Sequence, residues 1–167
     1  ERALDVLINV LEDESQEPMV RHEAAEGIGA IGKPDSLSIL EKYQNDKVVE
    51  VAETCQLALE RIKFLSNNQD STNPFYSIDP APPLNNTNIE ELKSILLNPE
   101  MDLFKRYRAM FSLRNIQSEE AVKALCEALQ CEGALFKHEI AFVLGQMRHP
   151  ESVRALIDSL RDENENE

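Results

Sequence analysis

The sequence contains no tryptophan, five glycines and three cysteines among its 167 residues. A glycine-poor chain that is rich in alanine, leucine and glutamate favours helix over sheet. The cysteines, Cys55, Cys126 and Cys131, are odd in number, lack metal-type spacing and fall within or beside apolar helical patterns. We therefore expect an all-α protein whose cysteines are reduced core thiols, as in the cytoplasm.

Long apolar runs are absent as well. No stretch approaches the roughly 18 apolar residues of a membrane span. The N-terminus has no basic region followed by an apolar run and a cleavage site. These absences predict a soluble, unsecreted protein that makes no contact with a membrane.

Basic residues are scarce, with 17 Lys and Arg against 31 Asp and Glu, so the net charge is −14. A field of this sign opposes binding to nucleic acid and favours a cationic partner. Acidic side chains that only solvate exposed helix faces would explain the charge equally well. The aromatic and basic run 104–108 has helical spacing, which favours packing and ion pairs over contact with RNA.

Internal repeats organise the chain. The apolar pattern of residues 4–11 recurs over 153–160, and His22–Leu40 matches His138–Leu156 at an offset of 116. A third match, between 103–109 and 135–141, has an offset of 32. A period of this length is typical of HEAT-like helical hairpins, which bury their apolar faces only by stacking.

The repeats predict helices over 2–12, 19–31, 36–45, 48–65, 88–98, 102–116, 119–130, 134–148 and 151–162. Asn, Ser, Asp and Pro dominate residues 66–86, and proline prevents a continuous helix there. We expect HEAT-like hairpins in two lobes, 1–65 and 87–167, joined by a proline-rich linker at 66–86. Thr87 and Glu90 form a candidate capping box.

Four glycines interrupt the helices that are expected to follow the two histidines of the 116-residue match. Gly27, Gly29 and Gly32 follow His22, and Gly145 follows His138. Because glycine lowers helix stability, we expect these positions to permit the close approach of a neighbouring helix.

Two His-Glu dipeptides are the candidate chemical groups. His22-Glu23 and His138-Glu139 occupy the same phase of the repeat, early in the second helix of a hairpin. Imidazole and carboxylate together suit redox-active iron, and facing helices build dinuclear iron sites from such side chains. The residue types also allow zinc, or a structural role in the repeat consensus. His149, before Pro150, fits a helix junction.

Neighbouring residues of an α-helix point about 100° apart, so His and the following Glu should not readily chelate one ion. Such a pair is instead expected to serve two metals, or to divide into one ligand and one supporting side chain.

Several segments resemble the deoxyhypusine hydroxylase family. They are Glu17–Ala24, Val51–Ala58, Ser77–Pro83, Arg106–Phe111 and Leu135–Glu139, and they extend from near one end of the chain to the other. The resemblance implies a two-lobed helical solenoid, four His-Glu motifs and two iron ions. It also implies a monooxygenase that uses O2 to hydroxylate deoxyhypusine on translation initiation factor 5A.

His22 and Glu23 match the second motif of the family, and His138 and Glu139 match the third. The chain begins inside a helical pattern without methionine and ends halfway through a hairpin, so it reads as an internal piece. We expect this piece alone to be inactive, to bind iron poorly as a monomer and to be a candidate for self-association. The rival classes are a metal-free HEAT scaffold that binds proteins and a HEAT-like bilin lyase.

Overall fold

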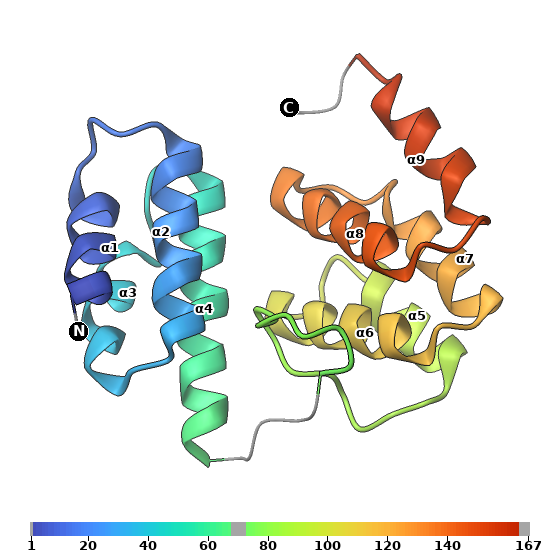
Figure 1. The fold of residues 1–167 in the computed structure, drawn as a ribbon, viewed down its shortest axis with the longest axis horizontal. Helices are drawn as coiled ribbons and strands as arrows, with labels where there is room; N and C mark the ends of the chain where they lie inside the picture. Colours follow the sequence, from blue (N-terminus) through green and yellow to red (C-terminus); the bar gives the residue numbers. More distant parts are fainter. Residues whose placement is uncertain (1, 68–72, 164–167) are drawn as a thin grey trace. The chain divides into compact units, whose positions relative to one another are not determined.

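The computed structural model describes residues 2–67 and 73–163, which form helices joined by turns, with no strand in this part (Figure 1). In chain order the elements are α1 (Arg2–Glu12), α2 (Pro18–Ile31), the 3-10 turn η1 (Pro34–Ser36), α3 (Leu37–Tyr43), α4 (Val49–Asn67), α5 (Ile89–Leu97), α6 (Leu103–Ile116), α7 (Glu119–Ala128), α8 (Ala134–Met147) and α9 (Ser152–Leu160). Their bounds differ from the predicted ones by at most two residues. The all-α HEAT-like prediction is confirmed. None of the described helices is long and apolar enough to cross a membrane.

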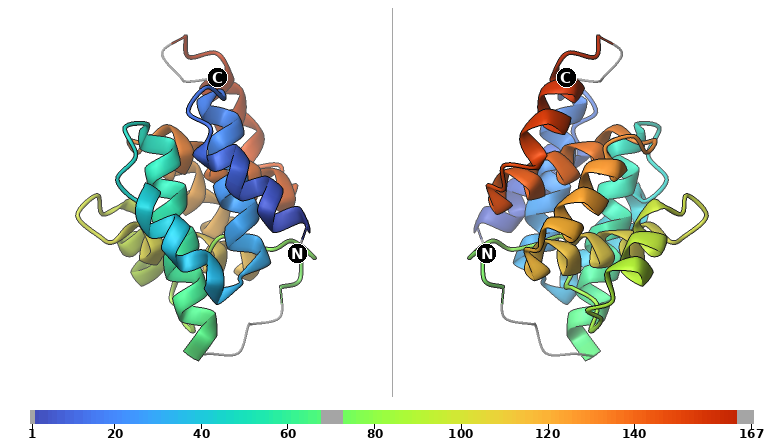
Figure 2. Two further views of the ribbon diagram at one scale, coloured as in Figure 1. Left: turned by 90° about the vertical axis from the view of Figure 1, so that its left-hand side faces the viewer. Right: turned by 90° about the vertical axis from the view of Figure 1, so that its right-hand side faces the viewer.

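The chain divides into two compact units between Pro82 and Pro83. In the first unit α2 packs against α1 and α4, and α3 packs against α4. In the second unit α6 and α7 both contact α5 and α8, and α9 packs on α7. The turned views of Figure 2 show α2 and α4 running alongside each other, as they do in Figure 1.

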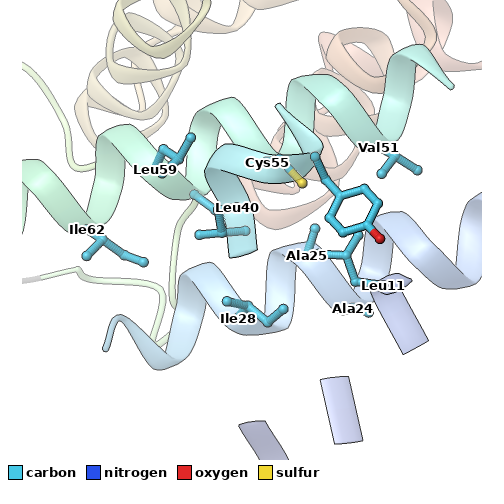
Figure 3. Close-up of a cluster of buried hydrophobic side chains, with 11 residues drawn as sticks. Leu11, Ala24, Ala25, Ile28, Leu40, Val51, Cys55, Leu59 and Ile62 are labelled. Carbon is cyan, nitrogen blue, oxygen red and sulfur yellow. The ribbon is translucent and has the colours of Figure 1, made fainter. Parts of the chain in front are cut away.

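The core of the first unit draws side chains from all four helices. Ala25 and Ile28 of α2 face Leu40 of α3 and Cys55 of α4, and all four side chains are fully buried (Figure 3). The expectation of a core thiol is confirmed for Cys55, while Cys126 and Cys131 are half-buried.

Side chains and backbone turns satisfy the helix ends. The carboxylate of Asp102 accepts from the Lys105 backbone N–H, and the Ser118 hydroxyl accepts from Ala121. The cap of α5 is the side chain of Asn88 and not the predicted Thr87. Asparagine in this position accepts two backbone N–H groups, so it caps the helix one residue later than a threonine box would.

The repeat period is visible in contacts between neighbouring second helices. Arg61 on α4 donates from Nη1 to the Gly29 carbonyl of α2 at 2.9 Å, and Arg114 on α6 donates to Gln146 Oε1 of α8 at 3.0 Å. Each contact joins residues 32 positions apart. One repeat therefore places equivalent positions side by side, as stacked hairpins require.

The connector between the units is extended and is tied down at several points. The Asp79 carbonyl accepts from Arg61 Nε at 2.9 Å, and the Leu84 backbone N–H donates to Ser112 Oγ at 2.8 Å. Ala81 is fully buried, whereas Tyr76 is fully exposed with a φ of 56°. Residues 68–72 of the expected linker lie outside the described part of the chain.

The glycines of α2 and α8 are predicted to respond oppositely to alanine. A Cβ at Gly29 would lie 2.7 Å from Ala58 Cβ, whereas a Cβ at Gly145 would meet nothing within 4 Å. The predicted close approach is therefore confirmed at Gly29 and wrong at Gly145. Urea unfolding should show Gly29→Ala destabilised by about 1–3 kcal/mol and Gly145→Ala stabilised by about 0.5–1 kcal/mol. Equal effects of the two substitutions would contradict this difference in packing.

Chymotrypsin is expected to cut the native protein first at Tyr76, because this side chain is fully exposed outside any helix. Trypsin provides the control, since no Lys or Arg lies between Lys63 and Lys93. Mass spectrometry of early digests should find two halves with chymotrypsin only. Early chymotryptic cleavage within residues 119–147 would count against Tyr76 as the first cleavage site.

Candidate functional site

The two His-Glu pairs occupy the same place in two helices of equal length. His22 and His138 are each the fifth residue of a 14-residue helix, α2 and α8 respectively. Each helix ends on a left-handed residue, Gly32 or Arg148, whose backbone N–H bonds the carbonyl four residues earlier. These caps are 116 positions apart, the same offset as the repeat in the sequence. The chain therefore presents two structurally equivalent His-Glu positions, one in each unit.

In the first pair the two side chains converge. His22 is 4% exposed, and its Nε2 lies 3.5 Å from Oε1 of the largely exposed Glu23. The expectation that these neighbours do not readily chelate one ion stays a prediction. The side chains are long enough to curve back toward each other although their Cα–Cβ bonds point about 100° apart.

The other ring nitrogen of His22 faces α4. Nδ1 lies 3.3 Å from the hydroxyl oxygen of Thr54, which is itself buried. Thr54 also donates to the Glu50 carbonyl at 2.7 Å, one turn earlier in α4. Sequence reasoning did not single out Thr54, although it lies 32 positions after His22, at the repeat period.

In the second pair the burial is reversed. His138 is exposed, whereas Glu139 is only 8% exposed. Phe136, two residues before His138, fixes this part of α8 against α6. Its ring centroid lies 5.6 Å from that of Tyr107, and the Arg106 guanidinium lies 4.0 Å above the ring. Arg106 and Tyr107 are thus packing residues, in keeping with the packing role expected for residues 104–108.

Arg21 anchors the start of α2 immediately before His22. Its Nε donates to the Leu11 carbonyl at 3.0 Å, and its Nη2 lies 2.6 Å from Asp46 Oδ2, with both side chains buried. The hydrogen bonds that Arg21 donates to Asp46 lower the pKa of Asp46 and raise the pKa of Arg21. Both groups therefore stay charged near neutral pH, and they hold the turn that carries His22.

The donor atoms of the first pair fit a cation. An ion bound by both at about 2.0–2.2 Å would hold the two donors about 3–4 Å apart, and the observed separation is 3.5 Å. Two donors do not complete a metal site, and residues 2–67 and 73–163 contain no group of three or more potential ligands. Burial raises the pKa of Cys55 to about 12, so this core thiol stays protonated near neutral pH.

The third histidine has a structural role. His149 Nδ1 accepts from the Glu151 backbone N–H at 3.3 Å, and the His149 carbonyl accepts from Ser152 Oγ at 2.8 Å. The prediction that His149 belongs to a helix junction is confirmed.

Comparisons with known proteins show which proteins the chain resembles. A family model described as HEAT repeats matches residues 1–60 and 89–167. The chain is 55% identical to deoxyhypusine hydroxylase of Drosophila melanogaster and 49% identical to that of Homo sapiens, each over 99% of this chain. It covers 56% and 55% of those proteins, so it spans about half of their length. The structure of human deoxyhypusine hydroxylase in complex with glycerol aligns with a TM-score of 0.95 at 49% identity, over 99% of this chain and 58% of that one.

The Arg21–Asp46 pair predicts loss of stability in acid. Because the folded state lowers the pKa of Asp46, the ion pair stabilises the fold above about pH 4 and is lost as pH falls through the folded pKa. Asp46→Asn should cost about 2 kcal/mol at neutral pH, and its unfolding free energy should fall less than that of the wild type between about pH 5 and pH 2. Urea unfolding across this range provides the measurement.

Glu14→Gln is the matched control, because it removes an exposed carboxylate that pairs with Lys47. This substitution should leave the stability at neutral pH nearly unchanged. If Asp46→Asn behaved like Glu14→Gln at neutral pH, the buried Arg21–Asp46 pair would not stabilise the fold.

Proposed function

Since the chain belongs to the HEAT-repeat family and is a homologue of deoxyhypusine hydroxylase, we propose that the protein carrying it is a deoxyhypusine monooxygenase. Its substrate is the deoxyhypusine side chain of translation initiation factor 5A, and its place of action is the cytoplasm. The observation that carries the proposal is the convergence of His22 and Glu23 to 3.5 Å in a chain about 50% identical to these hydroxylases.

His22, Glu23, His138 and Glu139 are the proposed metal ligands, with one pair contributed by each unit. Two iron ions, when bound, supply the activation of O2 that hydroxylation of an unactivated carbon requires. The protein groups hold and orient these ligands: Thr54 contacts the His22 ring, and Arg21 fixes the turn before it. A buried Glu139 keeps one carboxylate in place in the second unit.

The charge of the chain suits this substrate. Deoxyhypusine is a lysine-derived polyamine, and a net charge of −14 attracts such a cation over long range. Attraction of this kind raises the rate of encounter and weakens as salt is added.

Ligand number determines what this chain does alone. The resemblance calls for four His-Glu motifs, and this sequence contains two. With about half of the protein ligands missing, water would complete each coordination shell and binding would weaken. We propose that residues 1–167 alone are inactive and bind iron poorly as a monomer.

A chimera tests the proposal. The chain replaces the matching residues of the Drosophila melanogaster enzyme, with which it shares 55% identity, so the remainder of that enzyme completes the protein. The chimera should contain iron and convert deoxyhypusine to hypusine. His22→Ala or His138→Ala should lower turnover about 100-fold or more and reduce the iron content, because each removes a proposed ligand.

His149→Ala is the matched control, since His149 takes part in a helix junction and not in a His-Glu pair. It should retain iron and turnover. Full iron content and activity in His22→Ala and His138→Ala would overturn the ligand assignment. A folded chimera without iron that still binds the factor would favour a metal-free scaffold.

A further inference from the structure

The hydroxyl group of Thr54 contacts the ring of His22. Thr54 lies on α4, one repeat after His22 on α2, and both residues are at least nine-tenths buried. Its hydroxyl oxygen is 3.3 Å from His22 Nδ1 and 2.7 Å from the Glu50 carbonyl oxygen. Two hydrogen bonds therefore meet at one hydroxyl group that carries a single hydrogen atom.

The direction of both bonds follows from the number of hydrogens available. A backbone carbonyl only accepts, so the Thr54 hydroxyl must donate its hydrogen to the Glu50 carbonyl. The lone pairs that remain on Thr54 Oγ1 can only accept, so the hydrogen between it and His22 belongs to the ring. Nδ1 of His22 is thus protonated, and in the neutral imidazole Nε2 carries a lone pair.

The lone pair of His22 Nε2 lies near a carboxylate oxygen of Glu23. Nε2 lies 3.5 Å from Glu23 Oε1, and an ionised carboxylate has no hydrogen to give. Two acceptors at this distance attract a cation between them.

We infer that Thr54 is a positioning residue, which holds His22 in the Nδ1–H tautomer and leaves the lone pair of Nε2 available to a cation beside Glu23. The role of Thr54 in metal binding rests on the proposed function, but the tautomer of His22 does not.

Two substitutions separate the hydroxyl group from the shape of the side chain. Thr54→Val keeps the branched outline that packs between α2 and α4 but cannot accept a hydrogen bond. Thr54→Ser keeps the hydroxyl group and its bond to the carbonyl one turn earlier. A role in packing alone would be preserved in the valine variant, whereas a positioning role would be preserved in the serine variant.

Nitrogen-15 NMR of the histidine rings in this chain, recorded at about pH 8, reads the tautomer directly. His22 should show a protonated Nδ1 and an unprotonated Nε2 in the wild type and in Thr54→Ser. Thr54→Val should become a mixture of tautomers. An Nε2–H tautomer or an imidazolium in the wild type, or an unchanged spectrum in Thr54→Val, would overturn the inference.

His149 is an internal reference of the opposite kind. Its Nδ1 accepts from the Glu151 backbone N–H, so its hydrogen lies on Nε2. This ring should give the reversed pattern in every variant. A change at His149 in Thr54→Val would show that the substitution acts through the fold and not through His22.

Titration with Co²⁺ as the probe then separates this inference from the proposed function. Paramagnetic shifts at His22 should require about 10- to 100-fold more Co²⁺ in Thr54→Val than in the wild type or Thr54→Ser. Glu23→Gln should weaken the Co²⁺ effect and leave the tautomer unchanged. Full Co²⁺ binding at His22 in Glu23→Gln would defeat the proposed metal pair, whereas full binding in Thr54→Val alone would defeat the positioning role.

Discussion

The close approach of α2 and α4 fixes the first unit and the groups that project from it. It occurs at Gly29, where a side chain would collide with Ala58. With the helices this close, Arg61 reaches the Gly29 carbonyl and Thr54 reaches the ring of His22. A slip of one residue along either helix, about 1.5 Å, would break both contacts. The packing of two backbones therefore sets the geometry of a histidine nearly two helical turns away.

A second constraint acts at the start of the same helix. Arg21 donates to the Leu11 carbonyl, one of the last carbonyls of α1, which has no partner within its own helix. Arg106 repeats this bond to the Leu96 carbonyl in the second unit at 3.0 Å. A buried Arg21 is tolerable because the Leu11 carbonyl and the Asp46 carboxylate accept from its three nitrogens, and Asp46 also matches its charge. Together, the anchor and the close approach leave α2 little freedom to rotate.

The fold could be predicted because apolar periodicity and repeat offsets are local properties of the sequence. Side-chain burial could not, since it depends on which helix packs beside each position. Gly29 and Gly145 occupy matching places in the repeat, yet only Gly29 meets a neighbouring helix. The prediction of a capping box at Thr87 was wrong for a related reason, because Asn88 competes for the same N–H groups as Thr87. Predicting the contact of Thr54 with His22 would have required the repeat period to be used to find contacts between neighbouring helices.

The same dependence on neighbours gives the two His-Glu pairs opposite characters. In α2 the imidazole is held by Thr54 and the carboxylate is exposed, whereas in α8 the carboxylate is buried and the imidazole is exposed. Each pair thus combines one side chain that is held in place before any ion arrives with one that can adjust. A side chain held in place has little conformational entropy left to lose on binding, and an exposed one can follow the ion at a modest cost. For the proposed metal ligands, this division would let each unit begin to capture a cation before its coordination is complete.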